Sequence, residues 1–111
     1  MQTDQLTYKD LSKKIEGIAR EYFASKKEIN SQGGFLDPSR IDEDSPSAKY
    51  MGKVNDAYCS LNDIEKAIIY NDFFYQGYPM WWKGRYNRST YYRYKNKAMI
   101  HFMEAFENDK Y

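Results

Sequence analysis

The chain has 111 residues, of which 41% are hydrophobic and 30% charged, and its formal net charge is +1 at pH 7. This composition is typical of one folded domain with a single core and argues against a disordered chain. Its one cysteine, Cys59, excludes an intrachain disulfide and fits a reducing compartment. The first residues lack a secretory signal, and no apolar run is long enough to span a bilayer. We therefore expect a cytoplasmic protein with no membrane partner.

The first predicted element is an amphipathic helix over residues 7–27. Thr7, followed three residues later by Asp10, resembles a capping box. Apolar residues then recur at helical spacing, while charged residues occupy the other face. Residues 28–46 break this pattern with Gly, Pro and the acidic run 42–44, which lacks the spacing of a calcium loop, so we predict a solvated loop. The inward positions of the helix are predicted to be Leu11, Ile15, Ile18, Tyr22 and Phe23.

A second helical region is predicted from the proline that ends this loop. Pro46 suits the first position of a helix that continues to Cys59, whose thiol we expect to be buried and inert. Ser60 and Asp63 resemble another capping box, and the helix that they begin should end at Gly77. The side chains that this next helix should bury are Leu61, Ile64, Ala67, Ile68 and Phe74.

Two more helices complete the predicted fold. Pro79 allows a short helix that carries Trp81 and Trp82, at least one of which should lie in the core. Asn87 is a good N-cap for the last and longest helix. Strand patterns are nearly absent, so the predicted fold class is all-α, with about five helices in one domain over residues 1–111. The residues of the last helix that should face inward are Tyr91, Tyr94, Ala98, Phe102 and Phe106.

Positive charge is concentrated near the C-terminus. No Asp or Glu occurs from Phe73 to Met103. Segregated positive charge beside small polar and aromatic side chains is the pattern expected of a protein that binds phosphate backbones. The order of helices predicts a helix-turn-helix at about residues 79–106, packed on the N-terminal helices, with 88–97 as the recognition helix. The predicted DNA-contacting residues are Lys83, Arg85, Arg88, Ser89, Thr90, Tyr92, Arg93, Lys95, Asn96 and Lys97.

These residues have different predicted roles. Arg88 offers bidentate donors to guanine and Asn96 can pair with an adenine edge. Basic residues further along the helix, Arg93, Lys95 and Lys97, are predicted to contact phosphates, which fixes position without reading sequence.

Residues 61–69, the pair Trp81-Trp82 and residues 87–98 resemble the C-terminal helix-turn-helix of the ArpU/RinA group of phage-type transcriptional regulators. That group is similar to region 4 of bacterial sigma factors. The resemblance covers roughly residues 47–106, with Asn87 in place of the usual Ser before a Thr-Tyr-Tyr-Arg run, and implies a regulator that binds double-stranded DNA. The chain departs from the group in the bulky residues 80–83 of the short helix. Its Tyr, Asn, Lys and Ile usage is typical of an AT-rich genome, such as that of a mollicute or a low-GC phage.

No catalytic or cofactor motif accompanies these residues. His101 is the only histidine, and with Cys59 it gives too few ligands for a metal site. We therefore predict neither an enzyme nor a cofactor. The alternative is a non-catalytic protein-interaction module, such as an RNA polymerase-associated factor, which the nearly neutral net charge favours. The sequence leaves the oligomeric state open, although symmetric DNA half-sites would require a homodimer.

Overall fold

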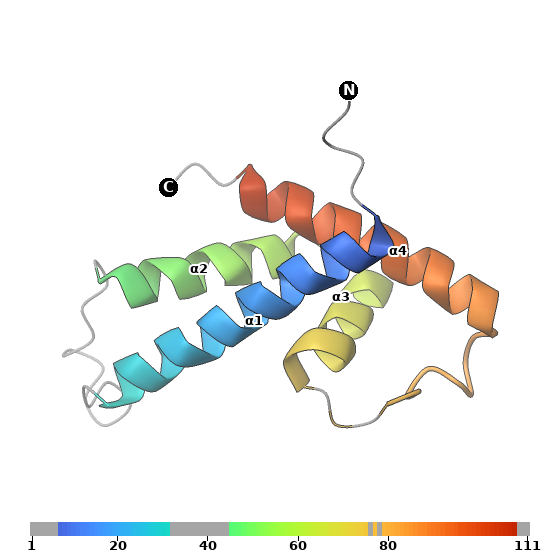
Figure 1. Cartoon of the computed structure of the whole chain (residues 1–111), viewed down its shortest axis with the longest axis horizontal. Coiled ribbons are helices and arrows are strands. Elements are labelled where there is room, and N and C mark those ends of the chain that lie inside the picture. The colour runs from blue at the N-terminus through green and yellow to red at the C-terminus, as the bar shows by residue number, and fades with distance from the viewer. Residues whose placement is uncertain (1–6, 32–44, 76, 78, 109–111) are drawn as a thin grey trace.

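A computed structural model describes residues 7–31, 45–75, 77 and 79–108. These residues fold into four α-helices, α1 (Tyr8–Ser31), α2 (Pro46–Cys59), α3 (Asp63–Ile69) and α4 (Arg88–Glu107), with a π-helical turn, η2 (Tyr70–Tyr75), continuing α3. Helix α1 packs along α2, α3 packs on α4, and α1 and α2 both contact α4 (Figure 1). The predicted all-α class is confirmed over the described residues, whereas the prediction of about five helices is wrong by one. Residues 32–44 of the predicted loop lie outside the described residues.

The first two helices begin as the sequence predicts. The Thr7 hydroxyl accepts the backbone N–H of Asp10 at 3.1 Å, and α1 continues to Ser31, past its predicted end. Pro46 is the first residue of α2, after Ser45, whose side chain accepts a backbone N–H at 3.1 Å. Each cap satisfies a donor that the first helical turn leaves free.

The N-cap of α3 is Asn62, two residues after the predicted N-cap Ser60. Asn62 accepts the N–H of Glu65 at 2.8 Å, and the Glu65 carboxylate accepts the N–H of Asn62 at 3.2 Å, which closes a capping box. The Ser60 hydroxyl instead donates to the Ala57 carbonyl at the end of α2. The predicted pair of Ser60 with Asp63 is therefore wrong.

The buried face of α3 also differs from the predicted one. It is centred on Ile68 and Ile69, which have no exposed surface, and Glu65 continues this face toward the start of the helix. Ile64 is consequently turned outward and is 43% exposed, contrary to prediction. Glu65 lies inward because its carboxylate caps the helix and contacts His101 on α4.

The short helix predicted after Pro79 does not form. Residues 79–86 make a series of turns, in which the N–H of Lys83 donates to the carbonyl of Met80 and that of Arg85 to Trp82. Met80 has φ of 62°, in the left-handed region, and an L-residue in this conformation cannot continue a right-handed helix. We call residues 79–86 the turn segment.

The core lies where the four helices meet. Trp82 is buried, which confirms that at least one tryptophan lies in the core, and Tyr94 and Phe106 are half-buried at its edge. Besides that of Ile64, two predictions of burial are wrong: Phe23 is 44% exposed, and the Cys59 thiol is exposed. Among the described residues, no helix is both long and apolar enough to cross a bilayer. The largest fully buried side chains are Tyr91, Phe102, Ile15, Ile68, Ile69 and Met99.

Two isoleucines of α3 provide a matched test of this packing. Ile68→Ala is expected to lower the free energy of unfolding by about 2–5 kcal/mol, because it leaves a cavity in the core. Ile64→Ala, which removes the same atoms from an exposed position, is expected to cost less than about 1 kcal/mol. Urea unfolding followed by circular dichroism measures both. Equal losses for the two variants would contradict the orientation of α3.

Candidate nucleic-acid interface

The candidate interface begins at the capped start of α4. Asn87 has an extended backbone and accepts the N–H of Thr90 at 2.9 Å and the hydroxyl of Ser89 at 3.2 Å. Asn87 is therefore the N-cap, as predicted from the sequence. The first turn of α4 contains no acidic residue. No carboxylate within that turn therefore neutralises its free backbone N–H groups or its basic side chains.

Most of the predicted DNA-contacting side chains reach the surface. Five of the six basic residues are exposed, and no ion pair to any of these five occurs within the described ranges. Ser89 and Tyr92 are also exposed, whereas Thr90 and Asn96 are half-buried. We call the five exposed cations the basic end, which consists of Lys83, Arg85, Arg88, Arg93 and Lys97.

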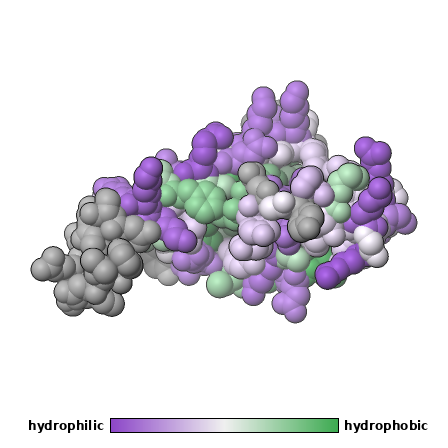
Figure 2. Space-filling model, turned by 90° about the horizontal axis from the view of Figure 1, so that it is seen from below, coloured by the Kyte–Doolittle hydropathy of each residue, from purple (hydrophilic) through white to green (hydrophobic). Residues whose placement is uncertain are grey.

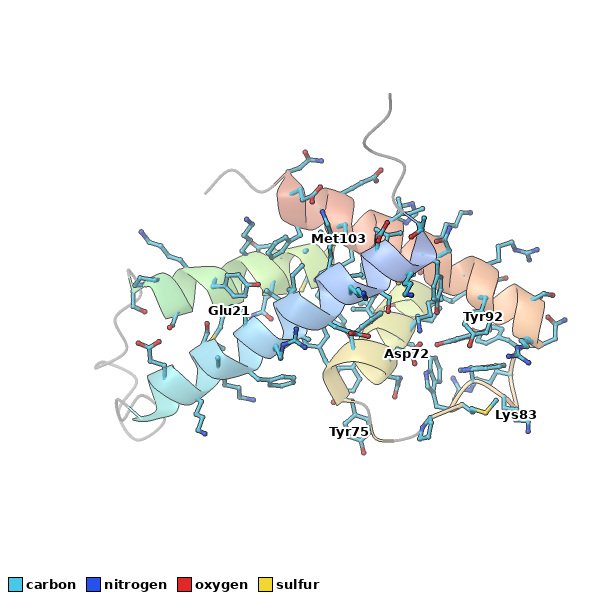
Figure 3. The ribbon with its side chains drawn as sticks, viewed as in Figure 1. Glu21, Asp72, Tyr75, Lys83, Tyr92 and Met103 are labelled. Carbon is cyan, nitrogen blue, oxygen red and sulfur yellow. The ribbon has the colours of Figure 1, made fainter. Side chains whose placement is uncertain are left out.

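The turn segment and the first part of α4 form one end of the molecule. In Figure 1 the start of α4 extends past the other helices, opposite the end where α1 finishes and α2 begins. Figure 3 shows Lys83 on the turn segment and Tyr92 on α4 at this same end. The turn segment and the first part of α4 thus place their cations at the same end of the molecule.

Lys95 does not belong to the basic end. Its Nζ lies 3.0 Å from Oδ2 of Asp72, and the Lys95 side chain is only 14% exposed. The ammonium group also lies over the rings of Phe73 and Tyr8, at 5.2 and 5.5 Å from their centroids. Since Asp72 already neutralises this charge, we remove Lys95 from the predicted phosphate contacts.

Asp72 is the residue that the sequence analysis missed. Its carboxylate accepts the indole N–H of Trp81 at 2.8 Å and the hydroxyl of Tyr91, in addition to its ion pair with Lys95. It therefore joins η2, the turn segment and α4 (Figure 3). The sequence signal that could have pointed to Asp72 was its position as the last acid before the acid-free window. Its three partners, however, lie 9 to 23 residues away in sequence, and only the fold brings them together.

Aromatic contacts fix the turn segment to α4. The Trp82 ring stacks on Tyr91, with centroids 4.3 Å apart and planes at 10°. Tyr92 meets Trp82 edge-on at 6.1 Å and Tyr8 of α1 at 5.8 Å. Such pairs stabilise beyond the area that they bury. The turn segment, with its two cations, is thereby held against the start of α4 although it is not a helix.

The network favours the protonated forms of two of its members. Burial by itself lowers the pKa of Lys95, but the hydrogen bond with Tyr8 and the negative charge of Asp72 outweigh burial and raise this pKa above its usual value. Burial, and then the hydrogen bond with Asp72, raise the pKa of Tyr91 far above its usual value. Lys95 therefore stays charged and Tyr91 neutral throughout the physiological range.

A second polar pair connects α3 and α4. His101 Nδ1 lies 2.5 Å from Oε2 of Glu65, whose side chain is buried. Because this carboxylate also caps α3, its role is to position the two helices. Over the described ranges, no group of three His, Cys, Asp or Glu residues could hold a metal ion.

Comparison of the chain with protein-family models, with curated proteins and with solved structures finds no match in any of the three. Function is therefore inferred from the chemistry and placement of the residues themselves.

The Asp72–Lys95 pair can be tested by a double-mutant cycle. Asp72→Asn leaves the Lys95 ammonium mostly buried without a counter-charge and is expected to lower the free energy of unfolding by about 3 kcal/mol. The double variant Asp72→Asn/Lys95→Met removes both charges and should recover most of this loss. Denaturant unfolding of the four proteins measures the coupling. A double variant as unstable as Asp72→Asn would contradict the proposed pairing.

The same network predicts a loss of stability in alkali. The pKa values of Lys95 and Tyr91 are raised from 10.5 and 10.0, so both groups stabilise the fold fully below these values. Their contributions are lost as the pH rises further, because the unfolded chain then releases protons that the folded chain retains. Urea unfolding at about pH 8 and about pH 11 should show this fall, and Tyr91→Phe should show a smaller one. An equal fall in both proteins would exclude Tyr91 as a source.

Proposed function

We propose that this protein is a DNA-binding transcriptional regulator that holds double-stranded DNA at its basic end, with residues 88–97 of α4 as the recognition helix. The observation that carries the proposal is the basic end itself, five exposed cations without ion pairs among the described residues, in a window without acids. Unneutralised cations attract phosphates because their binding releases condensed counterions.

The arrangement of side chains on α4 supports this proposal. Positions four apart lie on one side of a helix, so residues 88, 92 and 96 form one row and 89, 93 and 97 form the next. These two rows combine Arg, Ser, Tyr, Asn and Lys side chains, and all but the half-buried Asn96 are exposed. Ten helical residues are about 15 Å long, and a helix fits the major groove, which is about 12 Å wide.

The turn segment changes how a helix-turn-helix would be built. With no short helix after Pro79, α3 and η2 would be the supporting helix and α4 the recognition helix, joined by a connection longer than the usual turn of about three to four residues. In this arrangement Arg88 and Ser89, in the first turn of α4, read base edges. Lys83 and Arg85 contact the phosphate backbone from the turn segment.

The alternative is a protein-interaction module on the same helices, for example one that binds RNA polymerase. Salt dependence distinguishes the two. If all five cations contact phosphates, the slope of log affinity against log salt is about −4.5, which weakens duplex binding about 500-fold between about 50 and about 200 mM salt. Anisotropy titration of a labelled duplex, beside a single strand of equal length, measures this slope. Absence of duplex binding at the lower salt concentration would favour the protein-interaction module.

Three single variants test the predicted contacts. Arg93→Ala is expected to weaken binding to every duplex and to reduce the salt slope by about 0.9. Arg88→Ala should change which sequence is preferred, at a cost of about 1–3 kcal/mol on the preferred site. The control is Lys49→Ala, which removes an exposed charge from α2 and should leave both quantities unchanged. If Arg93→Ala and Arg88→Ala bind like the wild type, the proposed face is wrong.

A further inference from the structure

An aromatic groove lies away from the basic end, between α1, α2 and η2. Its hollow has a volume of about 460 Å³, within the range of small-molecule sites. In Figure 2 a group of hydrophobic side chains lies near the larger grey region, with hydrophilic side chains around it. The described residues that line the groove include six with aromatic rings, which are Tyr22, Phe23, Tyr58, Tyr70, Phe74 and Tyr75.

Three of the rings that line the groove form a cluster. Tyr22 meets Phe23 and Phe74 edge-on, at centroid distances of 5.7 and 5.6 Å, and Phe23 lies 6.1 Å from Phe74. Phe23 remains 44% exposed despite these contacts. The cluster therefore presents aromatic surface to the groove that the described helices leave uncovered.

Two other rings that line the groove form a stacked pair on η2. Tyr70 and Tyr75 are parallel to within 6°, with centroids 5.6 Å apart, and are 47% and 57% exposed. They are the first and last residues of the π-helical turn, a rare conformation that is frequent at functional sites. An offset stack with exposed rings is a platform on which a further planar ring can pack.

Gly77 keeps this platform in place. A Cβ at position 77 would lie 2.1 Å from the Tyr75 ring, far closer than non-bonded carbons approach. The ring thus occupies the space that any other residue at this position would need. Because Tyr75 is more than half exposed and points away from the helices in Figure 3, a larger side chain at 77 would displace its ring without disturbing the core.

The polar groups of the groove define the charge of its ligand. Among the described residues that line the groove, Lys26 is the only charged one, and Asn55 adds an amide. The hydroxyls of Tyr22, Tyr58, Tyr70 and Tyr75 form no hydrogen bond with another described residue, and neither does the Asn55 amide. Burial, and then the nearby Tyr70 hydroxyl, raise the pKa of Tyr58, which therefore remains a neutral donor at physiological pH. One cation and several neutral donors favour an anionic group.

From these contacts we infer a second binding site: the aromatic groove takes a small planar aromatic anion, whose ring packs on the Tyr70–Tyr75 pair and on Phe23, and whose acidic group meets the Lys26 ammonium. This site shares no residue with the basic end, so it is independent of the proposed DNA binding.

Two dyes with the same rings test the inference. The probe is 8-anilinonaphthalene-1-sulfonate, and N-phenyl-1-naphthylamine is its uncharged counterpart. The sulfonate is expected to bind about five times more tightly, the upper range for an exposed ion pair. Lys26→Gln should abolish this difference, and Gly77→Ala should weaken both dyes at least about threefold. Gly84→Ala is the matched control, since a Cβ there meets no atom within 4 Å.

NMR shift mapping locates the bound dye on the protein. Duplex titration of the same variants shows whether the groove and the basic end act independently. Lys26→Gln and Gly77→Ala should retain wild-type duplex binding, if the protein binds duplexes. Equal affinity for the two dyes, or shifts mapped outside the groove, would overturn the inference. Sedimentation gives another decisive outcome: a dimer that Phe23→Ala dissociates would show that a second copy of the chain fills the groove.

Discussion

The carboxylate of Asp72 is the constraint on which the C-terminal half of the structure depends. It holds the indole of Trp81, the hydroxyl of Tyr91 and the ammonium of Lys95, which come from the turn segment and from α4. A mostly buried carboxylate is costly unless it is paired and hydrogen-bonded, and these partners meet both needs. Loss of any one of these partners would leave a mostly buried polar group without its hydrogen bond or counter-charge. Because the Trp81 indole must reach Asp72, the network holds the turn segment in one position.

This network also determines how charge is distributed over the surface. Asp72 is the last acid before the acid-free window, and it forms an ion pair with the mostly buried Lys95. No ion pair in the described part of the chain neutralises the five cations of the basic end. A nearly neutral protein can therefore present a locally positive end, which is the physical basis of the proposed DNA binding.

The π-helical turn η2 serves two surfaces at once. It provides Asp72 and Phe73 to the side that packs on α4, and Tyr70, Phe74 and Tyr75 to the aromatic groove. A regular α-helix spaces side chains at 3.6 residues per turn, whereas the π-helical turn pairs positions five apart, which brings Tyr70 and Tyr75 into a stack. Through Asp72, η2 supports the network behind the basic end, and through its tyrosines it lines the aromatic groove, while the two proposed sites share no side chain.

The sequence by itself determined what local spacing controls. Thr7, Pro46 and Asn87 predicted helix starts because capping involves only residues within one turn, and periodicity identified Tyr91, Ala98 and Phe102 as inward. The tertiary structure decided the rest. Helical spacing did not reveal that Glu65 would replace Ile64 on the buried face, nor that Lys95 would turn inward, because both depend on partners on other elements. Similarly, the turn segment does not form a helix because Trp81 donates a hydrogen bond to Asp72 and Trp82 stacks on Tyr91. These contacts exist only once the chain has folded.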